Sequence, residues 1–141
     1  LMISIGERIG FPGELKDTLV NIRETGEFVV NIPSADTVDA VTASCATVDT
    51  EVDEFELSHM TAVPSVSVAA PSVLESLVSL ECRTMQEIAL GTDTLVLGTV
   101  TAVTSRPGLL TADLHVDTLE HRFLGRLAGP FYTTDMNRVA Q

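Results

Sequence analysis

The stretch KDTLVNIRETGEFVVNI, residues 16–32, predicts a helix, its end and a strand in direct succession. Apolar side chains recur at helical spacing in and just before its first half: Leu15, Leu19 and Ile22. This spacing predicts a helix over residues 16–25 with these side chains on one face, and Gly26 supplies the left-handed residue that commonly ends a helix. Residues 27–32, EFVVNI, then predict a short buried strand that stops at Pro33.

Lys16 is the only lysine in a chain with eight basic and twenty acidic residues, and it stands at the predicted helix start. Asp17 or Thr18 is expected to cap this helix by accepting a hydrogen bond from an early backbone N–H. The N–H groups that stay free, together with the positive end of the helix dipole, suit an anion. The Lys16 ammonium and the Thr18 hydroxyl add donors that suit a phosphate monoester. A solvated lysine at an ordinary helix start explains the spacing equally well.

The composition predicts one packed domain over residues 1–141. Aromatic residues make up only 4% of the chain, so aliphatic side chains must fill the interior. The most apolar window, residues 61–80, contains Pro64, Pro71 and Glu75, which suit strands and turns better than a membrane-spanning helix. Because no charged-then-apolar leader is visible, we expect a cytoplasmic protein that does not bind membranes.

The formal net charge of −12 argues against nucleic-acid binding, which requires a basic face. The same surface repels phosphate-bearing ligands except where a local positive site overrides it, which draws attention to Lys16 and the arginines. An excess of acid with a single lysine also suits a protein that stays dissolved at high salt, because salt screens the self-repulsion. We therefore expect a salt-adapted source.

The sequence contains no pattern typical of a metal centre, a hydrolase triad or a dinucleotide-binding loop. Cys45 and Cys82 form no C-x-x-C pair. Cys82 lies in an alternating run, where it is expected to be a small buried hydrophobe with Arg83 on the opposite face of the strand. Three scattered residues are expected at the surface or in turns: His59, His115 and His121. No catalytic residue is assigned from the sequence.

The first half of the chain predicts one more strand and one more helix. Residues 1–5 alternate weakly and predict a strand. A second helix is expected over residues 35–47, with Ser34 as its cap. Its apolar side would be formed by Val38, Val41 and Cys45. The acidic residues 49–56 are expected to form a solvated connector.

From Pro64 onward the hydrophobic period changes to two. This predicts strands at residues 66–68, 77–85 and 95–103. The turn residues 91–93 would join the last two strands into a hairpin, and Gly98 predicts a bulge or bend. Residues 123–132 are expected to form an ordered loop with aromatic anchors. The fold class predicted is therefore mainly β, a β-barrel with one or two helices at its edge.

Three segments resemble the flavin reductase-like, FMN-binding split-barrel family. Residues 16–32 resemble its KDT-x-x-NI-x-x-TGEFVVNI stretch. Residues 80–82 (LEC) with residues 97–100 (LGTV) resemble its LEC…iGeV hairpin, and residues 125–132 (GRLAGPFY) resemble its closing R-L-x-G-x-x-Y. The segments occur in the family's order, and the resemblance covers essentially the whole chain.

The resemblance implies a Greek-key split barrel, a homodimer and FMN bound near the subunit interface. In this family the KDT region contributes to the flavin phosphate site, so the residues expected there are Lys16, Asp17 and Thr18. Arg8 precedes this segment and is expected to join the phosphate site. Arg126 and Tyr132 are candidates for contacts around the flavin or the partner subunit, although packing of the C-terminal loop explains them equally well.

The resemblance also implies an NAD(P)H:flavin oxidoreductase, in which FMN, with FAD as the alternative, accepts hydride from NAD(P)H. Family members usually carry a preceding G-x-x-N-x-A-P-x-S-like segment that contacts the isoalloxazine ring. The chain is therefore interpreted as a domain that lacks the family's first strands. Two alternatives stay open: an FMN-holding electron carrier without reductase turnover, and an inactive truncated barrel.

Overall fold

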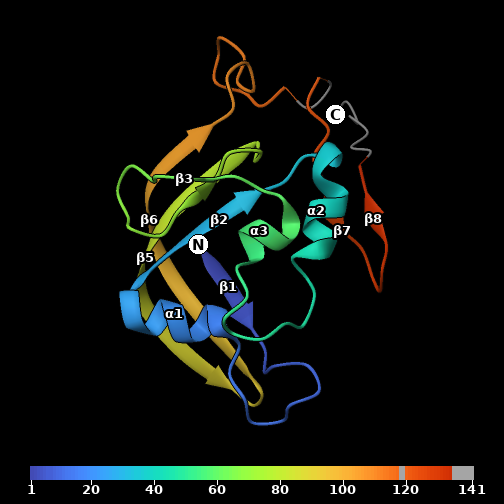
Figure 1. Ribbon diagram of the computed structural model, residues 1–141. Helices are drawn as coiled ribbons and strands as arrows, with labels where there is room; N and C mark the ends of the chain where they lie inside the picture. Colours follow the sequence, from blue (N-terminus) through green and yellow to red (C-terminus); the bar gives the residue numbers. More distant parts are fainter. Residues whose placement is uncertain (118–119, 135–141) are drawn as a thin grey trace.

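The computed structural model describes residues 1–117 and 120–134, and its architecture is mainly β (Figure 1). Its helices are α1 (Asp17–Thr25), α2 (Val38–Ala43), which follows the 3-10 turn Ala35–Thr37, and α3 (Glu54–Ser58). Its strands are β1 (Met2–Ile5), β2 (Glu27–Ile32), β3 (Ala62–Val63), β4 (Ser72–Val73), β5 (Val78–Leu90), β6 (Asp93–Ser105), β7 (Gly125–Arg126) and β8 (Tyr132–Thr133). The predicted mainly β fold class is confirmed, with three α-helices in the described ranges instead of one or two.

One antiparallel sheet of four strands, in the order β1-β6-β5-β2, forms the body of the molecule. The long β5–β6 hairpin is its centre, and Leu90 pairs with Asp93 across a tight turn. Gly91 in this turn has φ 64°, a conformation that glycine adopts without strain. The predicted hairpin is confirmed, and both of its strands run beyond the predicted limits.

The predicted irregularity at Gly98 is also present. The register of β5 against β6 shifts between Thr84 and Gln86, opposite Gly98. A Cβ atom added at Gly98 would lie 2.6 Å from Cζ of Phe28 and 3.2 Å from Cβ of Cys82. Glycine is therefore required because the Phe28 ring packs directly against the β6 backbone.

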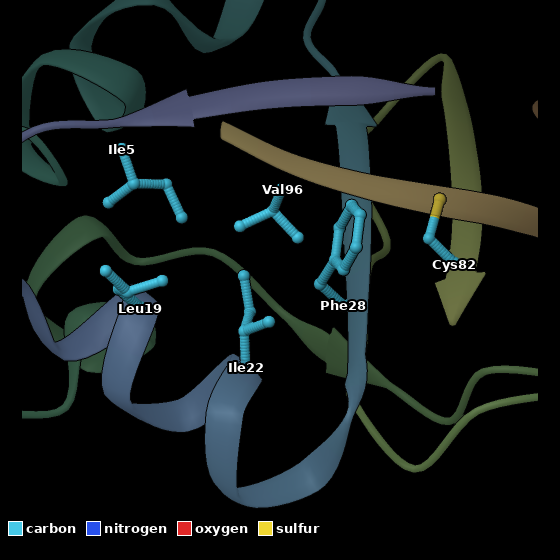
Figure 2. Close-up of a cluster of buried hydrophobic side chains, with 6 residues drawn as sticks. All are labelled: Ile5, Leu19, Ile22, Phe28, Cys82 and Val96. Atoms are coloured by element: carbon cyan, nitrogen blue, oxygen red, sulfur yellow. The ribbon is translucent and has the colours of Figure 1, made fainter. Parts of the chain in front are cut away.

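The main hydrophobic core lies between α1 and one face of the four-stranded sheet (Figure 2). It contains Ile5, Leu19, Ile22, Phe28, Cys82 and Val96. The helix ends as predicted, since the N–H of Gly26 (φ 70°) donates to the carbonyl of Ile22 at 2.7 Å. The prediction for Leu15 was wrong: it precedes the helix, in the bridge that closes the loop over residues 7–15, and is 42% exposed.

The predicted second helix is much shorter than residues 35–47. Helix α2 ends at Ala43, and the Ser34 side chain makes no capping hydrogen bond. The Ser44 hydroxyl donates to the Val41 carbonyl, which a longer helix would offer to the N–H of Cys45; that N–H donates to the Thr42 carbonyl instead.

The prediction of a solvated acidic connector over residues 49–56 was also wrong in part, because α3 begins inside this segment. The Asp53 carboxylate accepts a hydrogen bond from the Phe55 N–H at 2.8 Å and caps α3. His59 ends the helix in the left-handed conformation, with φ 56°. The longest helix in the described ranges, α1, has nine residues, which is too few to cross the bilayer core.

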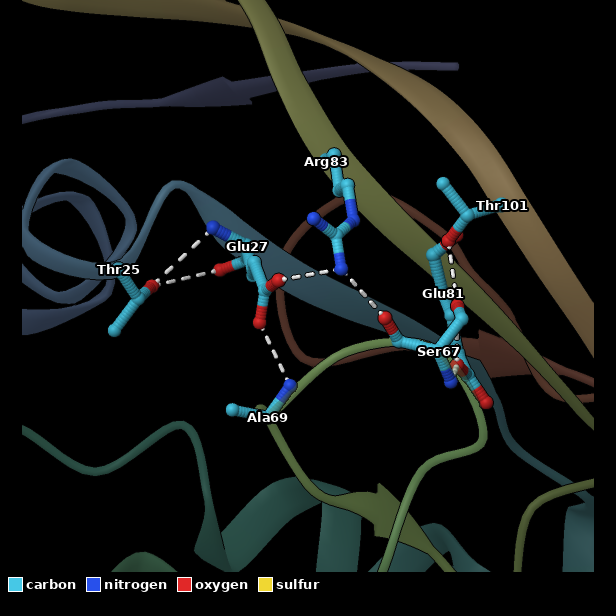
Figure 3. A network of polar contacts seen from close by, with 7 residues as sticks. All are labelled: Thr25, Glu27, Ser67, Ala69, Glu81, Arg83 and Thr101. Atoms are coloured by element: carbon cyan, nitrogen blue, oxygen red, sulfur yellow. Dashed lines mark hydrogen bonds and ion pairs between the residues drawn. The ribbon is translucent and has the colours of Figure 1, made fainter.

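The strand predicted over residues 66–68 is instead a bent loop between β3 and β4. Two carboxylates on the sheet hold it (Figure 3). Glu81 accepts from the N–H groups of Val66 and Ser67 and from the Ser67 hydroxyl, and Glu27 accepts from the Ala69 N–H. The backbone donors of this loop are thus satisfied by side chains, not by a neighbouring strand.

The C-terminal segment differs from the predicted loop with aromatic anchors. Strands β7 and β8 pair as a small antiparallel ribbon, in which Arg126 lies opposite Tyr132. Phe131 is 66% exposed, whereas the other two aromatic residues of the segment, Phe123 and Tyr132, are partly buried.

Candidate functional site

A cavity of about 670 Å³ opens at the start of α1. One wall is formed by Arg8, Ile9 and residues 16–18, and the facing wall by most of residues 44–55. Arg126 reaches the cavity from the β7–β8 ribbon. Five of the six residues predicted for the cofactor site therefore line one cavity, although they come from three separate parts of the sequence.

The start of α1 offers unpaired donors to this cavity. Lys16 occupies the cap position in an extended conformation, with φ −69° and ψ 145°, and no side chain caps the helix. The prediction that Asp17 or Thr18 would cap it was therefore wrong. Within the described ranges, the N–H groups of Asp17 and Thr18 and the Lys16 ammonium make no hydrogen bond or ion pair. The two N–H groups belong to the positive end of the helix dipole, and the ammonium adds a full positive charge beside it.

Arg8 lines the same cavity as Lys16 and lies in the loop that connects β1 to α1. The Arg8 N–H donates to the carbonyl of Glu14 at 2.8 Å, and Glu7 and Leu15 form an isolated bridge at the base of the loop. The Arg8 guanidinium lies 5.5 Å from the centroid of the Phe11 ring. It also donates to the carbonyl of Val48 on the facing wall.

Arg126 is positioned by Tyr132. The guanidinium donates to the Tyr132 hydroxyl at 2.7 Å and lies 4.9 Å from the ring centroid. Because β7 and β8 pair, both side chains project from one ribbon. Tyr132 does not itself line the cavity, so its contribution there is the orientation of Arg126.

The charge of the cavity is mixed. Three cationic side chains line it: Arg8, Lys16 and Arg126. Four carboxylates also line it: Asp17, Asp49, Asp53 and Glu54. Two of these accept hydrogen bonds from the protein, since Asp17 accepts from the Thr50 hydroxyl at 3.1 Å and Asp53 caps α3. The unengaged positive groups are concentrated on the side of the cavity where α1 begins.

No sequence pattern indicates that most of residues 44–55 line the cavity. These residues were assigned to the end of a helix and to a solvated connector, since an acidic run usually faces water. Asp53 followed by Phe55 could have indicated a helix cap, but nothing in the spacing predicts that the segment returns to the start of α1.

Cys82 is fully buried in the main core, as expected. Burial raises the pKa of its thiol, so the group stays protonated and apolar at neutral pH. Arg83 faces away from Cys82 and pairs with Glu27 at 3.1 Å on the other face of the sheet. Neither residue takes part in the cavity.

The sequence model of the flavin reductase like domain matches residues 1–120 of this chain. The chain belongs to the flavin reductase-like family. A protein of Aquifex aeolicus (strain VF5) is 32% identical over 132 residues, which span 94% of this chain and 66% of that protein.

Solved structures agree with the family assignment. The structure of nitrilotriacetate monooxygenase component B from Bacillus cereus is 27% identical with a TM-score of 0.91, and the match covers 99% of this chain and 70% of that one. Flavoredoxin of Desulfovibrio vulgaris (Miyazaki F) is 22% identical with a TM-score of 0.81, covering 99% of this chain and 73% of that one. The fold of this flavin reductase-like chain is thus the split barrel.

The flavin reductase-like chain is shorter than its relatives. The matched segments cover 66%, 33% and 42% of the lengths of three curated relatives.

Proposed function

We propose that this chain is the FMN-binding domain of an NAD(P)H-dependent flavin oxidoreductase. The observation that carries the proposal is the cavity, in which Lys16, the open start of α1 and two arginines from distant segments converge. In a protein with a net charge of −12, such a local gathering of donors suits one dianionic group. Membership of the flavin reductase-like family makes a flavin phosphate the natural occupant.

The donors fit a phosphate monoester. The ammonium of Lys16 and the hydroxyl of Thr18 would bind the phosphate together with the free N–H groups of Asp17 and Thr18. Arg8 and Arg126 would contribute guanidinium donors from the sides. The Asp17 carboxylate would repel the phosphate, so we assign Asp17 to the site through its backbone N–H, while its side chain holds Thr50.

The chemistry would belong to the cofactor: a bound flavin accepts hydride from NAD(P)H and passes electrons on. The chain's own residues would bind and orient the flavin. A site that suits a phosphate monoester favours FMN over FAD, because the two phosphates of FAD form a diphosphate bridge and leave no terminal monoester. One similar structure is a monooxygenase component, which supports transfer of electrons to a second protein.

We also propose that the protein is a homodimer. The β5–β6 hairpin carries large apolar side chains that are more than half exposed, namely Met85, Leu90 and Val103. A second copy would cover them.

Binding of FMN and riboflavin tests the phosphate site, because only FMN has the phosphate. Lys16→Ala should weaken FMN binding about tenfold, the loss expected for one charge-assisted hydrogen bond, and should leave riboflavin unchanged. Both dissociation constants are measured by quenching of flavin fluorescence. Arg23→Ala is the matched control, because Arg23 lies on the same helix and pairs with Glu87 outside the cavity. Equal weakening of both ligands by Lys16→Ala would refute the assignment of Lys16 to the phosphate.

A second candidate function is an electron carrier that holds FMN without turnover, which the likeness to flavoredoxin in fold leaves open. Addition of NADH or NADPH to the yellow protein without oxygen separates the two. Rapid bleaching supports the reductase, and colour that persists supports the carrier. If the protein takes up no flavin, both the reductase and the carrier are excluded.

A further inference from the structure

The contacts of Arg8 link the two walls of the cavity. Its guanidinium donates one N–H to the carbonyl of Val48, forty residues away, and the side chain lines the cavity beside Lys16. A guanidinium has five N–H donors in a rigid planar fork. Within the described ranges the guanidinium makes no other hydrogen bond, so its other N–H donors are available to a ligand.

The wall that Arg8 contacts, residues 44–53, has few other constraints. It contains no helix or strand between the end of α2 at Ala43 and the start of α3 at Glu54, and most of its residues are exposed. Its second side-chain contact with the opposite wall is the hydrogen bond from the Thr50 hydroxyl to the Asp17 carboxylate, at 3.1 Å. Both contacts therefore end on residues beside the free donors of α1.

We infer that Arg8 bridges a bound phosphate and the Val48 carbonyl, so that occupation of the phosphate site fastens residues 44–53 as a strap across the cavity. The inference rests on the proposed function, because it needs a phosphate at the start of α1. A phosphate held by Lys16 and the Asp17 N–H would fix the Arg8 guanidinium from its free side. The same guanidinium would then hold Val48 more firmly, and the fixed Asp17 would hold Thr50. Arg8 is thus a positioning residue for the strap as well as a phosphate ligand.

Quench-flow hydrogen exchange of the full chain tests this inference on the amides of residues 46–52. Riboflavin and FMN are compared at saturation, so that contacts of the ring system cancel. FMN should slow exchange of these amides about fivefold more than riboflavin does, since closing one hydrogen bond stabilises by roughly that factor. Equal protection by both flavins, or faster exchange with FMN, would overturn the inference while leaving FMN binding intact.

Substitutions of Arg8 distinguish the effect on exchange of residues 46–52 from the effect on FMN binding. Arg8→Ala should speed exchange of residues 46–52 in the flavin-free protein, whereas Arg23→Ala should not. Arg8→Lys keeps the positive charge and loses the fork, so it should still bind FMN but lose the extra protection by the phosphate.

If Arg8→Ala does not fold, Thr50→Val takes its place as the test. It removes the other contact and should lower the phosphate-dependent protection. If residues 46–52 exchange at the same rate in Arg8→Ala as in the wild type, the inference is overturned and the proposed function is unaffected. Failure of the wild type to bind either flavin overturns the proposed function and the inference with it.

Discussion

Gly98 sits where the ring of Phe28 crosses strand β6, and the space there is smaller than a methyl group. Because the Cβ of any other residue would lie 2.6 Å from the ring, Gly98→Ala should force the ring or the strand to move. Such overpacking typically costs about 1–3 kcal/mol of unfolding free energy, measurable by urea denaturation.

Phe28→Leu provides the control for this prediction. The shorter side chain leaves room at Gly98, so Gly98→Ala should cost less in the Phe28→Leu background than in the wild type. The same cost in both backgrounds would show that the clash with the ring is not the cause.

Single residues also show which parts of the candidate site could be predicted from the sequence and which could not. Lys16 and Thr18 could be assigned to a helix start because the apolar spacing of α1 and the glycine at its end are local signals, although the cap itself was predicted wrongly. The position of Arg8 depends on a loop closed by the bridge between Glu7 and Leu15, and that of Arg126 on its pairing with Tyr132. Only the family resemblance indicated these two arginines, since such tertiary contacts leave no periodic pattern.

Among the elements, the loop over residues 64–71 is held by a buried carboxylate. Glu81 has no exposed surface, and burial by itself would raise its pKa. Hydrogen bonds from the N–H groups of residues 66–68 and from the Ser67 hydroxyl outweigh this effect and lower the pKa below its usual value of 4.5. Glu81 is therefore ionised at neutral pH and anchors the loop through charge-assisted bonds.

Glu81→Gln should destabilise the protein by about 1–3 kcal/mol at neutral pH, because an amide NH₂ would face the donors of Ser67. The sign of the pH dependence follows from the lowered pKa. The stabilisation by Glu81 is present above pH 4.5 and is lost as the pH falls through the lower pKa of the folded state.

The difference in unfolding free energy between wild type and Glu81→Gln should therefore shrink below pH 4.5, as followed by chemical denaturation across pH. The exposed Glu24→Gln is the control and should change little at any pH. A difference that stays constant down to pH 2 would mean that the Glu81 charge does not hold the loop.

The elements predicted correctly are those whose signal is local and repeated. Helix α1, strand β2 and the β5–β6 hairpin combine periodic apolar residues with a glycine at the turn or helix end. Residues 66–68 alternate like a strand, but their N–H groups bind carboxylates from the sheet, and alternation cannot report that. The prediction for α2 extended past Ala43 because the Ser44 hydroxyl takes the Val41 carbonyl that a longer helix would need.

At the scale of the whole molecule, charge is the dominant feature. Twenty acidic residues stand against eight basic ones, which leaves a formal net charge of −12. The folded chain concentrates this charge, and the resulting repulsion opposes folding at low salt. The pairs of Arg23 with Glu87 and of Arg83 with Glu27 offset only a small part of it.

The midpoint of thermal unfolding should therefore rise as sodium chloride increases from about 10 mM to about 1 M, where the Debye length falls from roughly 30 Å to roughly 3 Å. The rise should be smaller near the pI of about 4.4, where the net charge vanishes, and calorimetry at both pH values measures it. Salt has two electrostatic effects here. It screens the repulsion between carboxylates, which raises the midpoint, and it screens the ion pairs, which lowers it. A midpoint that is highest near zero salt would show that local pairs outweigh the net charge, and would remove the case for salt adaptation.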